Sequence, residues 1–141
     1  MKFLLGLCLV ALLPAAAQGQ SANAGDDPFA AYLFPPERVM SHGLEIGLDD
    51  AQKVAIRNEV QKVQHKFLDG QFELQGESEK MVKLLQEKPV DETRVLAQVD
   101  RILALEKDIK KMQVGLLVRI KNLLTPAQQA KLTEIQKAAG K

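Results

Sequence analysis

Two histidine–carboxylate pairs are the residues of this chain whose types and spacing could bind a metal ion. His42 and Glu45 are three residues apart, and His65 and Asp69 are four residues apart. Residues at these separations share one side of a helix, so each pair can offer two ligands to a divalent ion. The pairs are candidate sites for Zn, Ni, Co or Cu, and the alternative is that both histidines are ordinary surface residues.

The side chains that most enzymes use are scarce in this sequence. The single cysteine, Cys8, lies in an N-terminal apolar run, and the chain has two histidines and no glycine-rich phosphate loop. Met40, Met81 and Met112 are better explained as adaptable core residues than as soft copper ligands. We therefore predict a protein that is not an enzyme and that requires no cofactor.

The first 17 residues have the order of segments that is typical of a secretory signal peptide. Lys2 precedes an apolar run over residues 3–13, and small residues follow that run. The run is too short to cross a bilayer, whose apolar core is about 30 Å thick. We predict cleavage after Ala17, with Ala24 as the alternative, and export of a soluble chain to the periplasm.

Charge is unevenly distributed along the rest of the chain. Residues 107–141 contain eight basic and two acidic side chains, whereas residues 18–106 contain ten basic and 16 acidic ones. A nearly neutral chain of this kind does not have the composition of a nucleic-acid-binding protein. The opposite charges of the two segments favour antiparallel self-association or contact with an acidic partner.

Hydrophobic spacing predicts the helices that would position these side chains. Residues 18–35 are expected to form a flexible arm, and residues 36–46 a short helix that Gly47 stops. A long helix over residues 50–87 follows, with an apolar stripe at heptad spacing. Its Gly70 and Gly76 mark either a kink or break, or a place where another helix crosses closely.

The strongest periodicity lies in the next helix, after Lys88-Pro89 ends the previous one. Asp91 can cap this helix, and one apolar series then recurs at strict seven-residue intervals. The series is Val95, Ile102, Ile109, Leu116 and Leu123, with Leu96, Leu103, Leu117 and Leu124 beside it. Such a stripe requires a partner, which the short turn supplies as an antiparallel hairpin. A last helix begins at Thr125-Pro126 and ends near residue 139.

These elements define an all-α protein, in which residues 36–139 form a long helical hairpin with short flanking helices. The apolar stripes are wider than one neighbouring helix can cover. We therefore predict an intertwined homodimer, because a second copy would bury the remaining apolar surface.

A nine-residue phrase occurs twice, as LDDAQKVAI and as LTPAQQAKL. Each copy combines a leucine, a capping residue and a glutamine: Leu48, Asp49 and Gln52, then Leu124, Thr125 and Gln128. The cap and the glutamine three positions later match the capping box that begins many helices. We predict that the phrase is scaffolding, with the leucines packed on the core, and that it is not a ligand site.

The doubled phrase, in a small exported helical chain with no cysteine after the signal peptide, resembles the Spy/CpxP family. The copy LTPAQ matches the L-T-x-x-Q motif, and LDDAQ differs by Asp49 in place of threonine. The resemblance covers about residues 36–138, and LFPPERVMSHGLEIGLDDAQ is most similar to the branch of heavy-metal sensors and resistance proteins. Family members include periplasmic stress chaperones, ZraP-like proteins and CnrX-like sensors. They form long, bent hairpins that pair into cradle-shaped dimers.

We predict first a metal-responsive function in heavy-metal or envelope stress, with a chaperone or adaptor as the alternative. A metal-responsive sensor or modulator of envelope stress would bind an ion near the short helix and change its hold on a membrane sensor protein. An ATP-independent chaperone or adaptor would hold unfolded periplasmic proteins on an apolar and basic face. Five cations of the third helix suit such a face: Lys107, Lys110, Lys111, Arg119 and Lys121. An ordinary solvated helix face would carry similar residues.

Overall fold

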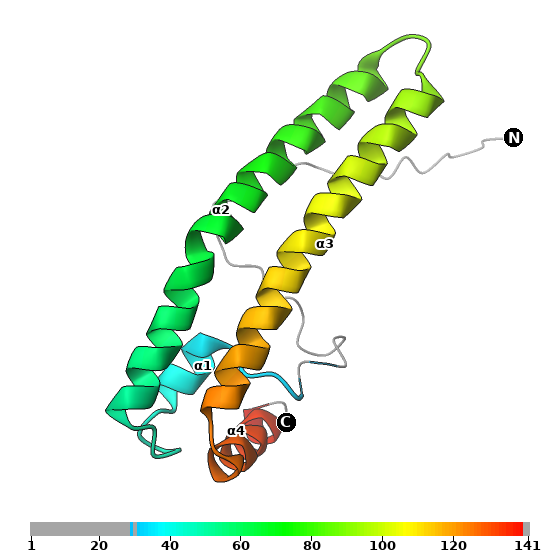
Figure 1. Ribbon diagram of the computed structural model, residues 1–141. Helices are drawn as coiled ribbons and strands as arrows, with labels where there is room; N and C mark the ends of the chain where they lie inside the picture. Colours follow the sequence, from blue (N-terminus) through cyan, green and yellow to red (C-terminus); the bar gives the residue numbers. More distant parts are fainter. Residues whose placement is uncertain (1–28, 30, 140–141) are drawn as a thin grey trace, which may run out of the picture.

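The computed structural model describes Phe29 and residues 31–139, which contain four helices and no strand. The helices are α1 (Pro36–Ser41), α2 (Asp50–Gln86), α3 (Glu92–Leu123) and α4 (Pro126–Ala139). α2 and α3 lie side by side as an antiparallel pair, and α1 and α4 lie at the open end of that pair (Figure 1). The predicted all-α class is confirmed. The predicted signal peptide and most of the predicted arm fall outside the described residues.

The short helix is the element whose predicted end is wrong. α1 stops at Ser41 rather than at residue 46, and turns follow it. The backbone N–H of Gly43 donates to Met40 O at 3.2 Å, and Leu48 N–H donates to Gly43 O at 2.7 Å. These bonds replace the α-helical pattern. Gly47 does end the segment, with the positive φ of 68° that glycine adopts readily.

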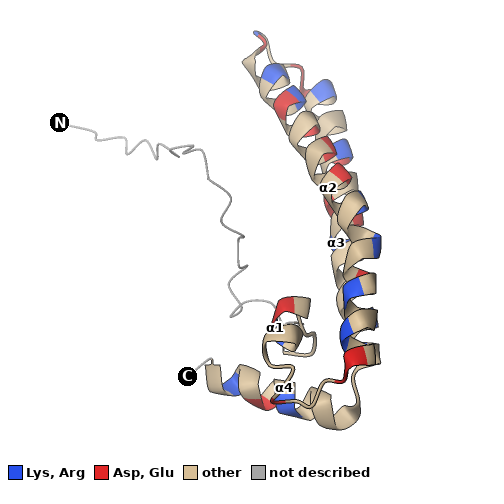
Figure 2. Cartoon of the chain, turned by 90° about the vertical axis from the view of Figure 1, so that its left-hand side faces the viewer, with Lys and Arg blue, Asp and Glu red and all other residues tan. Residues whose placement is uncertain are grey.

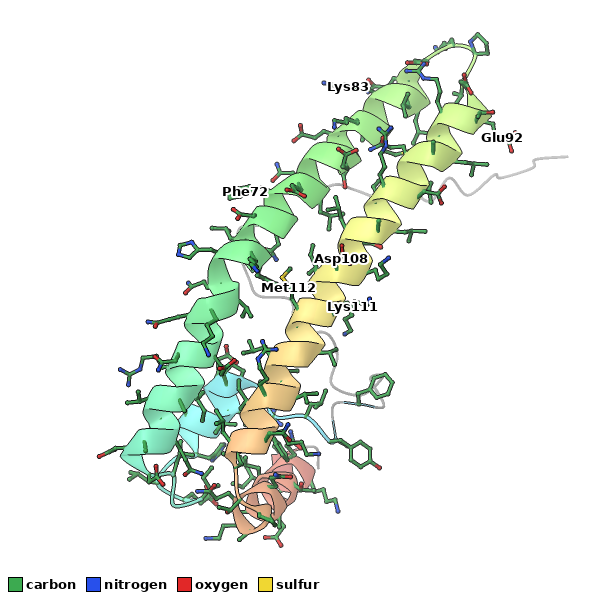
Figure 3. All side chains as sticks on the ribbon, viewed as in Figure 1. Phe72, Lys83, Glu92, Asp108, Lys111 and Met112 are labelled. Atoms are coloured by element: carbon green, nitrogen blue, oxygen red, sulfur yellow. The ribbon has the colours of Figure 1, made fainter. Side chains whose placement is uncertain are left out.

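α2 runs through both of its glycines without interruption, so neither of them breaks the helix. A methyl group on Gly70 would lie 3.1 Å from Ile109 Cγ1 of α3, whereas one on Gly76 would meet no atom within 4 Å. Beside Gly70, Met112 points from α3 toward α2 (Figure 3). Close crossing of a second helix therefore explains Gly70 and does not explain Gly76.

The hydrophobic core lies at the open end of the hairpin, where all four helices meet. Eight apolar side chains are buried there: Phe34, Val39, Ile46, Leu48, Ile56, Ile120, Leu124 and Leu132. Further along the hairpin the facing side chains, such as Ile102 and Ile109, are half-buried. The hairpin beyond the core is therefore a thin layer of two helices with much apolar surface still accessible.

Both copies of the repeated phrase form the predicted capping boxes. At α2, Gln52 N–H donates to Asp49 Oδ1 at 2.7 Å, and Asp49 N–H donates to Gln52 Oε1 at 3.2 Å. At α4, Gln128 N–H donates to Thr125 Oγ1 at 3.2 Å, and Thr125 N–H donates to Gln128 Oε1 at 2.9 Å. The leading leucines of both copies are buried in the core.

The two glutamines also bind each other, which the sequence analysis did not anticipate. Gln52 Nε2 donates to Gln128 Oε1 at 2.8 Å, and Gln128 Nε2 donates to Gln52 Oε1 at 2.9 Å. Gln52 Nε2 also donates to Leu123 O at 2.9 Å, and Gln128 Nε2 to Gly47 O at 3.1 Å. In each case the acceptor is the carbonyl just before the leucine of the other copy. The repeat therefore builds a local two-fold joint that holds the start of α2 against the start of α4.

Alanine substitutions at the two glycines test the close crossing. Gly76→Ala should raise the free energy of unfolding by about 1 kcal/mol, because alanine favours the helix and its methyl group meets open space. Gly70→Ala should gain less or lose stability, because its methyl group would press on Ile109. Urea unfolding followed by circular dichroism measures both variants, and equal gains would contradict the crossing.

Gln52→Glu tests whether this glutamine is a joint as well as a cap. Glutamate also completes a capping box, so a cap alone would tolerate the change. A carboxylate cannot donate to Leu123 O or to Gln128 Oε1, so the free energy of unfolding should fall by about 2 kcal/mol. Thermal unfolding should show no comparable loss for Gln61→Glu, an exposed control on the same helix. Equal stability of both variants would refute the joint.

Candidate functional site

The hairpin has two different faces, because α1 and α4 lie on one side of it (Figure 2). We call that side the inner face and the opposite side the outer face. A cleft of about 340 Å³ lies beside α1 on the inner face, and its lining includes Gln64 of α2 and Leu117 of α3. Residues seven positions apart on a helix lie on nearly the same side of it. Counting in steps of seven from Gln64 and Leu117 therefore identifies the other residues of the inner face.

Apolar side chains continue along the inner face beyond the core. On α3, steps of seven residues from Leu117 lead to Lys110, Leu103 and Leu96. On α2, Leu68 lies one turn after Gln64, and Val82 and Leu85 follow on the same side. We name the five apolar residues the inner patch: Leu68, Val82, Leu85, Leu96 and Leu103.

The inner patch is accessible to a partner. The side chains of its five members are between 48% and 55% exposed, so they are not part of the apolar stripe that α2 and α3 bury against each other. Scattered exposed leucines are ordinary, but a series that follows one face of two helices is typical of an interaction surface. The spacing of Leu96 and Leu103 in the sequence places them in one row, but it does not show which face of the hairpin that row occupies.

The outer face carries ion pairs instead of apolar residues. Arg119 Nε donates to Glu59 Oε2 at 2.7 Å across the two helices, and Lys62 Nζ lies 2.6 Å from Glu59 Oε1. The hydrogen bond from Lys62, followed by the one from Arg119, lowers the pKa of Glu59, so this carboxyl stays ionised. Figure 2 shows charges of both signs along the hairpin. An apolar ligand would therefore prefer the inner face.

Two of the five predicted cations of α3 have structural contacts. Arg119 is held by Glu59 on the outer face. Lys121 Nζ donates to Tyr32 O at 2.8 Å and lies 5.9 Å from the centre of the Phe34 ring. Lys121 therefore fixes the end of the predicted arm to the core, so both cations are already engaged within the chain.

The other three predicted cations remain accessible. Lys107, Lys110 and Lys111 are exposed, and none of them forms an ion pair within the described part of the chain. Lys110 stands in the inner-face series between Leu103 and Leu117. The inner face thus combines apolar residues with at least one accessible positive charge.

The structure brings together one of the two predicted metal-binding pairs. His42 Nδ1 lies 3.0 Å from Glu45 Oε2, in the turn after α1. His65 and Asp69 are both exposed on α2, and no hydrogen bond or ion pair joins them in the described structure. Within Phe29 and residues 31–139, no group of three or more His, Cys, Asp or Glu side chains could hold a metal ion.

Gln98 is the polar residue that the sequence analysis missed. It is 3% exposed between α2 and α3, and its Nε2 donates to Glu77 O at 2.8 Å and to Glu77 Oε2 at 2.6 Å. The hydrogen bond from Lys80, followed by the one from Gln98, lowers the pKa of Glu77. The sequence did contain a signal for this contact. Gln98 lies three residues after Val95 and four before Ile102, so it is a polar residue within the apolar stripe of α3. Glu77 interrupts the stripe of α2 in the same way.

Two further findings bear on the class of protein. No helix of the described residues combines the length and the apolarity that a membrane crossing requires. The chain matches no protein-family model, no curated protein and no solved structure. The resemblance to the Spy/CpxP family therefore stays a prediction from the sequence.

Proposed function

We propose that this chain is a non-enzymatic accessory protein whose inner face holds apolar segments of other proteins. The observation that carries the proposal is the inner patch, which extends from the core along both long helices on the side of α1 and α4. The mode of action would be that of an ATP-independent chaperone or adaptor. The signal-peptide pattern of residues 1–17 supports the periplasm as its location.

The size of the inner patch suits weak and reversible binding. A half-exposed leucine or valine contributes roughly 1 kcal/mol when a partner covers it. Five such residues give roughly 5 kcal/mol, which the entropy lost on association largely offsets, so a client must also contact other residues of the inner face. Complexes of this strength dissociate without an energy source, as a holding function without ATP requires.

The charges on the inner face are mixed. Lys110 interrupts the apolar series of α3, and it forms no ion pair in the described residues. Segments that place an acidic residue among apolar ones would satisfy both features. Glu106, however, lies one helical turn before Lys110 and is also exposed, and Glu37 lines the cleft, so we expect selection mainly by hydrophobicity.

We also propose that the predicted homodimer forms through a separate surface. Phe72 is 64% exposed on the side of α2 away from α3 (Figure 3), and Val54 is 51% exposed. Val54 precedes Phe72 by 18 residues, which are five helical turns, so both lie along one edge. A homodimer formed along this edge would leave the inner patch free for other proteins.

Leu103→Asp tests the inner patch. A charge at this position should weaken binding of an unfolded, acidic model protein about tenfold, because it removes apolar area and repels the client. The measurement is fluorescence anisotropy with the labelled client, together with suppression of aggregation. Ala104→Asp puts the same charge on the next exposed position, away from the patch, and should bind normally. Equal loss in both variants would contradict the proposal.

A metal-responsive function is the second candidate, and the contact between His42 and Glu45 favours it. Metal-binding imidazoles commonly donate one ring N–H to a carboxylate, while the other nitrogen binds the ion. In this arrangement Glu45 would orient the ring and His42 Nε2 would be the ligand. The pair lies beside α1, so an occupied site could alter how α1 packs on the hairpin.

His42→Ala tests the second candidate by native mass spectrometry with zinc, nickel, cobalt or copper. If His42 is a ligand, this variant should lose the ion that the unmodified chain binds, whereas His65→Ala should retain it. Glu45→Gln should weaken binding by about tenfold if Glu45 only orients the ring. Uptake that is unchanged in His42→Ala would exclude this site.

A further inference from the structure

A second cleft, of about 460 Å³, lies near the turn that joins α2 and α3. Four cationic residues contribute to its lining, Lys80 and Lys83 from α2 and Arg94 and Arg101 from α3. Glu87 is the one acidic residue among those that line it. A cleft of this composition attracts anions, and it is independent of the inner patch and of His42.

The position of this cleft follows from a repeated arrangement of charges. Glu59, Lys62 and Arg119 form the ion-pair cluster of the outer face. A shift of 18 residues, which is five helical turns, converts them into Glu77, Lys80 and Arg101. The shift is forward on α2 and backward on α3, as the antiparallel arrangement requires. The cleft therefore lies on the outer face, beside a second copy of the same cluster.

The two copies of the cluster differ in what binds the glutamate. In the first copy, Arg119 donates to Glu59 Oε2 at 2.7 Å. In the second copy, the buried Gln98 donates to Glu77 Oε2 at 2.6 Å, and Lys80 binds Glu77 Oε1 at 2.5 Å. Both carboxylate oxygens of Glu77 are thus occupied by other donors. Arg101 forms no ion pair within 4 Å in the described structure, although its charge is near enough to contribute to the lowered pKa of Glu77. Its side chain also lines the cleft.

We propose that the cleft binds a phosphate group, with Arg101 as the principal contact. A guanidinium can donate two parallel hydrogen bonds to a phosphate, which a single ammonium group cannot do. Lys83, which is exposed and forms no ion pair in the described residues, contributes to the lining. Its side chain lies on the side of α2 away from α3 (Figure 3), so it adds positive charge from a greater distance. Arg94 is held by Glu87 at 2.6 Å, but both side chains are accessible and such surface pairs exchange readily.

The test is a titration of the chain from residue 18 onward with inorganic phosphate at low ionic strength, followed by backbone amide NMR. Phosphate should shift the resonances of residues 80–87 and 94–101. Arg101→Gln should weaken binding roughly fivefold or more, because a charged donor is lost. Glu87→Gln should strengthen it roughly two- to fivefold, because it frees Arg94 and removes a competing anion.

Arg119→Gln is the matched control, because it removes an arginine from the equivalent position of the first cluster. It should leave phosphate affinity unchanged, since Arg119 is already bound by Glu59. Equal weakening by both arginine variants, or an unchanged spectrum in phosphate, would overturn the proposal.

The source of the phosphate group is decided by a second arm of the experiment. Vesicles of phosphatidylglycerol present the group on a membrane surface, and phosphatidylcholine vesicles control for the lipid itself. Sedimentation with phosphatidylglycerol vesicles that Arg101→Gln abolishes would identify a headgroup as the source. Binding of free phosphate without sedimentation would identify a soluble anion.

Discussion

The hydrogen-bonded pair of Gln52 and Gln128 fixes the relation between the hairpin and its two short helices. Packing of α2 on α3 alone would give a thin pair with little to bury. The amide pair brings the start of α4 against the start of α2, and places both leading leucines in the core. Because every donor and acceptor of the two amides is used, neither side chain can turn away without leaving buried polar groups unpaired. The separate inner and outer faces follow from this joint.

A second polar contact, between Gln98 and Glu77, sets the alignment of the hairpin beyond the core. Apolar heptads by themselves allow neighbouring helices to slide by one repeat, whereas a buried polar residue is satisfied in one alignment only. Gln98 meets this condition, since it donates to both the backbone and the side chain of Glu77. The same contact occupies the carboxylate oxygen that Arg119 takes in the equivalent cluster. One buried amide thus aligns the helices and leaves an arginine accessible.

Much of the fold could be predicted from local signals in the sequence. Heptad spacing, Asp91 and Pro126 fixed the long helices and the last helix, because caps and apolar periodicity act over a few residues. The predicted end of α1 was wrong. The turn at Gly43 depends on the hydrogen bond from Leu48 N–H to Gly43 O rather than on local helix propensity. The candidate sites were harder to predict from the sequence. Spacing brought His42 to Glu45, but it could not show that Arg119 and Lys121 are engaged by residues far away in the chain.

The concentration of the core at one end of the molecule has a consequence for its motions. The free energy needed to open a segment locally grows with the buried apolar contacts that the segment makes. The eight buried apolar residues anchor the joined end, whereas the half-buried helices near residues 87–91 have few such contacts. The hairpin can therefore loosen progressively toward its turn while the joined end stays folded. Such a gradient of stability would let the distance between α2 and α3 change near their turn, so that the hairpin could fit ligands of different shape without unfolding.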